Sequence, residues 1–413
     1  MKGVQGIGWL ASLCAAILVG VIGLEWLQGG DRAADLPGKP KSLVATIKGD
    51  ARTTRAFTWY TGEADSSEGK LQITQGIDAR MLEESDVLTY RAESTIVDIG
   101  AGQKNTAHQV EVTGLEPGTT YIYRVGNGQT KGWSEPAVFT TERETEDAFT
   151  FINVADSQGE TEADFELWGK TLDKAFEAFS GARFIIHNGD LTENPEDESA
   201  WDHFFGKASK WLPSIPLMPV TGNHDEIDGK AERYTSHFNL PDNGAKRSLP
   251  GTSYSFDYGD AHFIILNTES NIGGQTEWLR QDLQSTDKPW KIAAIHRPVY
   301  GGNSYSKVQE WAEVFDEFGV DLVLQGHNHE YSRSYPVRGG EVVAPGEGTV
   351  YVTINTAGQK FNEKKRERFY HAVHFQNGKQ MFAGVTINGN TLTYQAYDVD
   401  GKLLDEIVLA QHN

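Results

Sequence analysis

The first part of the chain alternates apolar and polar residues in short stretches from Ser42 to about Thr141. Gly, Asp and Pro separate these stretches at intervals typical of the strands of a β-sandwich. The expected strands are Ser42–Ile47, Ala56–Thr61, Thr106–Val112, Thr120–Val125 and Ala137–Thr141. Because this part has few histidines and no cluster of metal-ligand residues, we interpret residues 42–143 as a packing or spacer domain.

After Phe149 the pattern changes to apolar strands that alternate with amphipathic helices, as in layered α/β domains. Thr161 and Asp164 are placed to cap a helix whose aromatic residues recur at helical spacing and therefore face the core. Two more helices are expected at Thr276–Leu283 and Ser306–Phe318. The expected strands are Phe149–Val154, Phe184–Ile186, Leu217–Val220, His262–Leu266, Ile292–Ile295 and Leu322–Leu324.

The last part, from Gly348 to Leu409, returns to a strand pattern, and Ile387–Leu392 has the Asn-Gly signature of a hairpin. A charged stretch at Glu142–Asp147 separates the two patterns. The sequence therefore predicts an all-β sandwich followed by an α/β layered domain at residues 148–413.

The N-terminal segment is almost wholly apolar from Ile7 to Leu27, and Lys2 precedes it. This length approaches the ~20 residues that span a bilayer. We interpret residues 1–34 as an uncleaved signal-anchor or a cleaved export signal, with a buried helix of the fold as the third alternative. Lys2 favours an N-terminus that stays inside, so the body is expected outside the cytoplasm, membrane-anchored or secreted.

The formal net charge is -21 at pH 7, and the single cysteine, Cys14, lies in the apolar segment. A body this acidic repels duplex nucleic acid, which we therefore do not expect as a partner. A small phosphorylated substrate stays possible, because bound divalent metals would reverse the local potential. The folded body has neither disulfides nor a thiolate metal site.

Polar residues recur where the predicted strands end. The five motifs are Asp156-Ser157-Gln158, Asn188-Gly189-Asp190, Gly222-Asn223-His224-Asp225, His296-Arg297 and Gly326-His327-Asn328-His329. Ligands of open α/β sheets bind at the carboxyl ends of the strands. A carboxylate can bridge two metal ions, and imidazoles and an amide complete the shells with little added charge. We also expect the glycines of these motifs to let the backbone turn sharply.

This order of motifs resembles the calcineurin-like metallophosphoesterase superfamily over residues 149–413. The sandwich ahead of it extends the resemblance, back to Ser42, to purple acid phosphatases and their bacterial relatives. Leu115–Tyr121 also resembles the tyrosine corner of fibronectin type III domains. The resemblance implies a β-sandwich core flanked by helices in the second domain, and two bound divalent or trivalent metal ions, with Fe, Mn and Zn left open.

The resemblance also assigns roles to single residues. Asp190 would bridge the metals, and Asp156 and His329 would bind the first one. Asn223, His296 and His327 would bind the second, with Asn223 also near the substrate. His224 would donate a proton to the leaving oxygen while Asp225 holds its ring. A metal-bound hydroxide would then attack a phosphate monoester in line.

Two positions depart from the family pattern. Gln158 stands where many members have a metal-binding histidine, so it either binds by its amide oxygen or leaves that place to water. Glu193 stands where purple acid phosphatases have a tyrosine ligand. Without a phenolate, we expect a colourless enzyme. Arg297 either contacts a phosphate oxygen of the substrate or forms a salt bridge.

The residues leave two other functions open. The same ligands suit a phosphodiesterase or nucleotidase, because monoesters and diesters differ in pocket shape. An anchored binding or scaffold protein with a relic metal site is the alternative of another class, and the intact Asp190 and His224 argue against it. Neither the natural substrate nor the oligomeric state follows from the sequence.

Overall fold

The computed structural model describes residues 39–62, 68–129, 132–146 and 148–411, which belong to one compact unit. The predicted leader or anchor at residues 1–34 lies outside the described residues. Within the described ranges, the helices lack the length and hydropathy that a membrane span needs.

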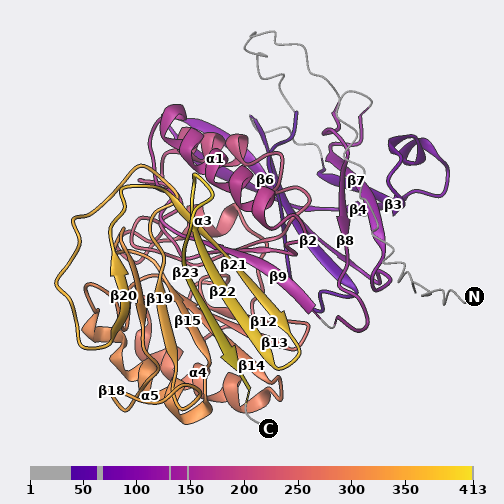
Figure 1. The fold of residues 1–413 in the computed structure, drawn as a ribbon. Helices are drawn as coiled ribbons and strands as arrows, with labels where there is room; N and C mark the ends of the chain where they lie inside the picture. Colours follow the sequence, from indigo (N-terminus) through magenta and orange to yellow (C-terminus); the bar gives the residue numbers. More distant parts are fainter. Residues whose placement is uncertain (1–38, 63–67, 130–131, 147, 412–413) are drawn as a thin grey trace, which may run out of the picture. The chain divides into compact units, whose positions relative to one another are not determined.

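The first domain consists of two four-stranded antiparallel sheets (Figure 1). One has the order β1 (Lys41–Thr46), β2 (Thr54–Gly62), β6 (Gln103–Thr113) and β5 (Glu93–Gly100). The other has the order β4 (Leu88–Arg91), β3 (Lys70–Gln75), β7 (Thr120–Gly126) and β8 (Ala137–Thr140). The five strands named from the sequence are confirmed as β1, β2, β6, β7 and β8, with small changes at their ends.

Aromatic residues from both sheets fill this sandwich. Phe57 of β2 packs against Tyr123 of β7, with ring centroids 4.4 Å apart, and against Phe139 of β8. The Tyr121 hydroxyl accepts a hydrogen bond from the backbone N–H of Glu116 at 2.9 Å, which confirms the tyrosine corner. The core is thus built by the inward-facing residues of alternating strands.

The second domain contains two larger mixed sheets (Figure 1). The six-stranded sheet has the order β11 (Leu217–Pro219), β10 (Ile185–His187), β9 (Ala148–Val154), β21 (Met381–Asn388), β22 (Thr391–Asp398) and β23 (Leu403–Ala410). The seven-stranded sheet has the order β12 (Tyr254–Tyr258), β13 (Ala261–Leu266), β14 (Trp290–Ile295), β15 (Leu322–Gln325), β19 (Val350–Thr353), β16 (Tyr331–Ser334) and β20 (His371–Phe375). β17 (Val337–Arg338) and β18 (Glu341–Val342) form a small separate pair.

The two sheets pack face to face, and the rings of Phe151 and Phe184 from one contact Phe263 from the other. Helix α1 (Glu162–Ala178) contacts β21 of the first sheet and α2 (Glu198–Lys207), while α3 (Glu232–Ser236) follows later. Helices α4 (Ile272–Ser285) and α5 (Gln309–Phe318) share a second core with the other sheet. This arrangement confirms the predicted β-sandwich core flanked by helices.

Local signals in the sequence explain several element ends. Thr161 and Asp164 form a capping box at the start of α1, as expected. The predicted hairpin joins β21 and β22, with Asn388 opposite Thr391. The expected helix at 306–318 begins as a short 3-10 helix, Ser306–Val308, before α5.

Candidate metal centre

The strands that carry the five motifs are parallel to one another within each sheet. β9, β10 and β11 run in one direction in the six-stranded sheet, as do β13, β14 and β15 in the seven-stranded sheet. Their carboxyl ends therefore meet at one edge of each sheet, and the segments after them supply the polar side chains. The side chains of Asp156, Asp190 and His296 are buried there, although each carries or can carry a charge.

Five of the predicted ligands fall into two groups that share Asp190. One group is Asp190, His296 and His327, and the other is Asp156, Asp190 and His329, with ligand atoms within 4.8 Å of one another in each. Asp190 Oδ2 lies 3.1 Å from His296 Nε2, and Asp156 Oδ1 lies 3.4 Å from His329 Nε2. A carboxylate common to both groups stands where a bridging ligand belongs.

Several hydrogen-bond acceptor atoms lie close together at the centre of these groups. His296 Nδ1 donates to the Asn188 carbonyl at 2.8 Å, so in the neutral ring Nε2 carries a lone pair. That lone pair faces Asn223 Oδ1 at 3.2 Å and the Asp190 carboxylate. Gln158 Oε1 is buried and has no hydrogen-bond partner. Buried acceptors that face one another are stable only around a cation, so the residues fit two metal ions.

The carboxylates around His296 favour positive charge at this position. Burial opposes a charge on His296, but the Asp190 and Asp156 carboxylates outweigh burial and raise the pKa of His296 to about 10. Burial raises the pKa of Asp156 as well, although His329 and His296 act against that rise. The neighbouring carboxylates therefore favour positive charge at this position, as the ligands of a cation would.

The backbone at these ligands is in the left-handed region, which favours glycine. Among the described residues, nine non-glycine residues have positive φ, and four of them are predicted ligands: Asp156 (55°), Asp190 (55°), His327 (69°) and His329 (49°). Strain of this kind concentrates at functional sites. Gly222 also leaves room for the bridging carboxylate, because a Cβ at this position would lie 2.3 Å from Asp190 Oδ1.

Residues 149–331 match the family model described as calcineurin-like phosphoesterase, and residues 40–141 match that of the purple acid phosphatase N-terminal domain. The second domain is thus similar to calcineurin-like phosphoesterases, and the first is similar to the N-terminal domain of purple acid phosphatases. With its Asp/His groups of dimetal type, the chain is a metal-dependent phosphoesterase of the acid phosphatase-like kind.

Known proteins similar to this metallophosphoesterase include two mammalian ones named acid phosphatase type 7. The mouse protein (Mus musculus) is 27% identical, with 78% of this chain and 82% of that protein covered. The human protein (Homo sapiens) is 25% identical, with 97% and 96% covered. A solved structure of a purple acid phosphatase from yellow lupin (Lupinus luteus) seeds has the same fold, with a TM-score of 0.77, 17% identity and coverage of 90% and 74%.

His224 of the phosphoesterase is not held by the residue that the resemblance implied. Its Nδ1 donates to the Glu193 carbonyl at 2.8 Å, and its backbone N–H donates to Asp190 Oδ1 at 2.8 Å. Asp225 instead accepts from the backbone N–H groups of Asp190, Gly222 and Leu191 at 2.7, 2.8 and 3.0 Å. The predicted contact between Asp225 and the His224 ring is therefore corrected: Asp225 fixes the turn that carries the bridging carboxylate.

Three other positions of the phosphoesterase, Gln158, Arg297 and Glu193, also have defined surroundings. Gln158 lies beside Asp190, to which its Nε2 donates at 3.3 Å. Arg297 donates to Glu269 at 2.8 Å, and its Nη1 lies 3.2 Å from His327 Nε2, which favours the salt-bridge alternative. Glu193 pairs with Lys360 instead of turning toward the predicted ligands.

A cavity of about 560 Å³ opens onto the predicted metal centre, and its walls include Asp190, Asn223, His224, His327 and His329. The segment 359–365 supplies another part of the wall, where Lys360, Asn362 and Lys365 line the cavity. The sequence reasoning missed this segment because it carries no motif. The run of basic residues from Lys360 to Arg368, in a chain of net charge -21, was the signal that could have marked it.

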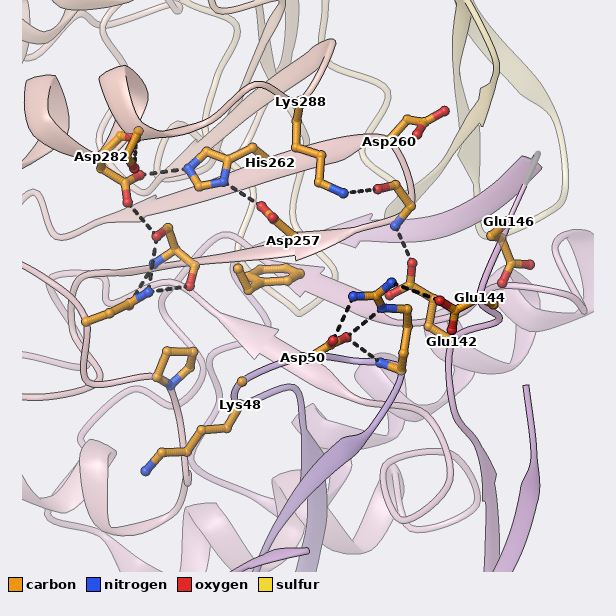
Figure 2. A pocket seen from close by; sticks show the side chains of 18 of the residues that line it. Lys48, Asp50, Glu142, Glu144, Glu146, Asp257, Asp260, His262, Asp282 and Lys288 are labelled. Carbon is orange, nitrogen blue, oxygen red and sulfur yellow. Dashed lines mark hydrogen bonds and ion pairs between the residues drawn. The ribbon is translucent and has the colours of Figure 1, made fainter. Parts of the chain in front are cut away.

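A larger cavity, of about 920 Å³, is lined by residues of both domains and by none of the predicted ligands. Figure 2 shows the many carboxylates around it and His262 between Asp257 and Asp282. The two imidazole nitrogens lie 2.7 and 2.8 Å from those carboxylates. These contacts use both nitrogens of the ring, so we assign His262 a structural role.

Proposed function

We propose that this metallophosphoesterase hydrolyses phosphate monoesters, with His224 as the proton donor to the leaving oxygen. The observation that carries the proposal is the position of His224, which lines the same cavity as Asp190 while its backbone N–H binds that carboxylate. A carbonyl oxygen can only accept, so the Glu193 carbonyl fixes the proton on Nδ1. Nε2 is then the ring nitrogen that can carry a proton to a substrate.

The predicted ligands divide between two sites in this proposal. Asp190 would hold both ions, and Asp156 and His329 would hold only the first. The second ion would be held by Asn223, His296 and His327. Bound divalent ions supply Lewis-acid stabilisation of a phosphoryl group and activation of water. The acid phosphatase names of the mouse and human relatives support the monoester as the substrate class.

The protein's own residues would orient and neutralise the ester. Lys360 and Lys365 line the cavity and offer positive charge to phosphate oxygens. Lys360 is tied to Glu193, whose backbone carbonyl also holds the His224 ring. The cation at the cavity wall and the proton donor are therefore positioned through one residue.

Hydrolysis of p-nitrophenyl phosphate and of bis(p-nitrophenyl) phosphate by the metal-loaded full chain tests the proposal. We expect the monoester to give the higher kcat/KM. Preference for the diester would favour the phosphodiesterase alternative. No hydrolysis of either ester by a chain that holds two metal ions would contradict a catalytic function and favour the binding-protein alternative.

We also propose that the folded body lies outside the cytoplasm, on the basis of the apolar stretch Ile7–Leu27 and the preceding Lys2. A C-terminal reporter that is active only outside the cytoplasm would test this in a bacterial host. Whole-cell reporter activity is expected for the full chain and should be lost when residues 1–34 are deleted. An inactive reporter on a stably expressed full chain would contradict the proposal.

A further inference from the structure

A second group of metal-ligand side chains lies on the edge strand β20 and the segment before it. Glu367, His371 and His374 each offer a ligand atom within 4.8 Å of the others. His371 and His374 are three residues apart, which would place them on opposite faces of a regular strand. A β-bulge prevents this: Ser332 pairs with His374 and Arg333 with Val373, but Ser334 pairs with His371. The extra residue turns both histidines to one side, with ring centroids 4.2 Å apart.

The distances in this group match a coordination sphere better than a set of hydrogen bonds. Glu367 Oε2 lies 3.3 Å from His371 Nδ1 and 3.2 Å from His374 Nδ1. Charge-assisted N–H···O bonds are usually about 2.7–2.9 Å long. Ligand atoms at about 2.0–2.1 Å from a tetrahedral Zn²⁺ lie about 3.3 Å apart. The second Glu367 oxygen pairs with Lys364, which leaves Oε2 to the two rings.

Lone pairs also face one another around these rings. His371 Nδ1 accepts the Arg368 backbone N–H at 3.2 Å, so Nδ1 is unprotonated, and its single lone pair would bind a metal ion in place of that N–H. His374 has a carboxylate at each nitrogen, Glu367 at Nδ1 and Glu330 at Nε2, the latter at 3.2 Å. A neutral imidazole has one N–H and cannot donate to both carboxylates, so either a second proton or a metal ion must lie on one side of the ring.

Two further observations point to a metal ion. The side chains of His371 and His374 are 2% and 1% exposed, and the Nε2 atom of each, like Glu330 Oε1, has no hydrogen bond of good geometry. A metal at Nδ1 of His374 would leave its Nε2–H to Glu330, a carboxylate–histidine–metal relation.

We propose that Glu367, His371 and His374 bind a third metal ion, separate from the catalytic pair, with Zn²⁺ as the ion that two imidazoles and one carboxylate suit. Glu330 orients His374 from behind, and water completes the shell. The ion would fix the segment 359–368, which supplies a wall of the catalytic cavity. That segment is already tied to the centre, since the Lys360 carbonyl lies 3.0 Å from His329 Nδ1 and Glu330 accepts the Lys365 N–H at 2.7 Å.

Metal content of the full chain at a buffered free Zn²⁺ concentration tests this site. His371→Gln and Glu367→Gln should each bind one Zn²⁺ fewer than the parent chain. Glu363→Gln, an exposed glutamate of the same segment outside the cluster, should bind as many as the parent. If His371→Gln or Glu367→Gln binds as much Zn²⁺ as the parent, the site does not exist and the cluster holds only protons.

Asp190→Asn separates this result from the proposed catalytic function. The substitution removes the ligand that the two catalytic sites share. The Zn²⁺ that the Asp190→Asn chain still binds is therefore expected at the third site, and it should be lost in the double variant Asp190→Asn/His371→Gln. Retention of that Zn²⁺ in the double variant would overturn the third site and leave the catalytic proposal intact. The His371→Gln chain should melt like the parent in EDTA, and a parent-like melting curve there excludes misfolding as the cause.

Trypsin provides a readout of the segment itself, which contains Lys364, Lys365, Arg366 and Arg368. Zn²⁺ should slow cleavage there about tenfold in the parent chain, because the bound ion disfavours local opening. The same Zn²⁺ should leave cleavage of His371→Gln unchanged. Equal protection of both chains would show that the catalytic metals alone order the segment and would overturn the proposed role of the third ion.

Discussion

The Nε2 atom of His296 lies 3.1 Å from Oδ2 of Asp190, and both side chains are buried. Asp190 is also the one residue shared by the two groups of predicted ligands. Asp190→Asn removes its charge and one of its two ligand oxygens. We expect metal affinity and phosphatase activity to fall by about a hundredfold or more. Asp86→Asn, at an exposed loop position of the first domain, is the control. Full metal content in Asp190→Asn would refute the bridging role.

Replacement of the proposed proton donor should depend on the leaving group. In His224→Gln, kcat for an alkyl phosphate should fall by about 10²–10⁴-fold, because an alkoxide needs a proton to depart. Hydrolysis of p-nitrophenyl phosphate should fall less, since nitrophenolate leaves without one. Metal content should stay unchanged, and His203→Gln should behave like the parent. An equal loss for both esters would contradict the role of His224 as an acid.

Asp225 should matter for the shape of the centre instead of the protonation of His224. Asp225→Asn replaces an acceptor of three backbone N–H groups by a side chain with one acceptor oxygen. We expect a loss of about 1–3 kcal/mol in the free energy of unfolding, measured by chemical denaturation. The exposed Asp228→Asn should change it by less than about 0.5 kcal/mol. A stable Asp225→Asn chain with the leaving-group profile of His224→Gln would restore the ring-holding role.

The glycine ahead of Asn223 should be needed for steric reasons. A Cβ at Gly222 would meet Asp190 Oδ1 at 2.3 Å, so Gly222→Ala displaces the bridging carboxylate. We expect metal binding to be lost while the circular dichroism spectrum is retained. Gly206→Ala in α2 is the matched control, because no atom lies within 4 Å of the added Cβ, and it should add up to about 1 kcal/mol of stability. Normal metal content in Gly222→Ala would show that the turn can yield.

His262 should make stability depend on pH. Burial acts against its charge, but hydrogen bonds to Asp257 and Asp282 outweigh burial and raise its pKa to about 9 (Figure 2). The folded pKa thus lies above the unfolded value of about 6.5. The contribution is therefore complete below pH 6.5 and is lost as the pH rises through 9.

His262→Gln should accordingly cost stability at pH 6 and little at pH 10. The difference between the two should be about 1–3 kcal/mol, since one pKa unit corresponds to about 1.4 kcal/mol and Asp257 is partly solvated. Denaturation at both pH values measures it, with His203→Gln as the control. An equal cost at pH 6 and pH 10 would show that packing alone explains the effect.

The predicted strand ends show what the sequence reveals about such a centre. Asp156, Asp190 and His296 each follow an apolar strand. Parallel strands end at a common edge of the sheet, so the proximity of these side chains could be predicted from the local pattern alone. The capping box of α1 and the hairpin after β21 were local in the same sense. Their signals lie within a few residues of one another.

Contacts between distant segments could not be read in this way. Asp225 was expected to hold the ring of the adjacent His224. It instead accepts a hydrogen bond from the backbone N–H of Asp190, which lies 35 residues earlier in the chain. The wall formed by Lys360 and its neighbours depends on how the last strands return to the sheet. Likewise, the bulge that unites His371 and His374 appears only once the register between β16 and β20 is known.

The left-handed backbone of the predicted ligands is held by the chain's own hydrogen bonds. The His327 N–H donates to the Asp156 carboxylate at 3.0 Å, and the Asp190 N–H donates to Asp225. Both partners in each of these bonds belong to the protein. The turns that place the ligands are therefore held in part by the fold itself, so a substitution such as Asp225→Asn can alter ion binding although it removes none of the predicted ligands.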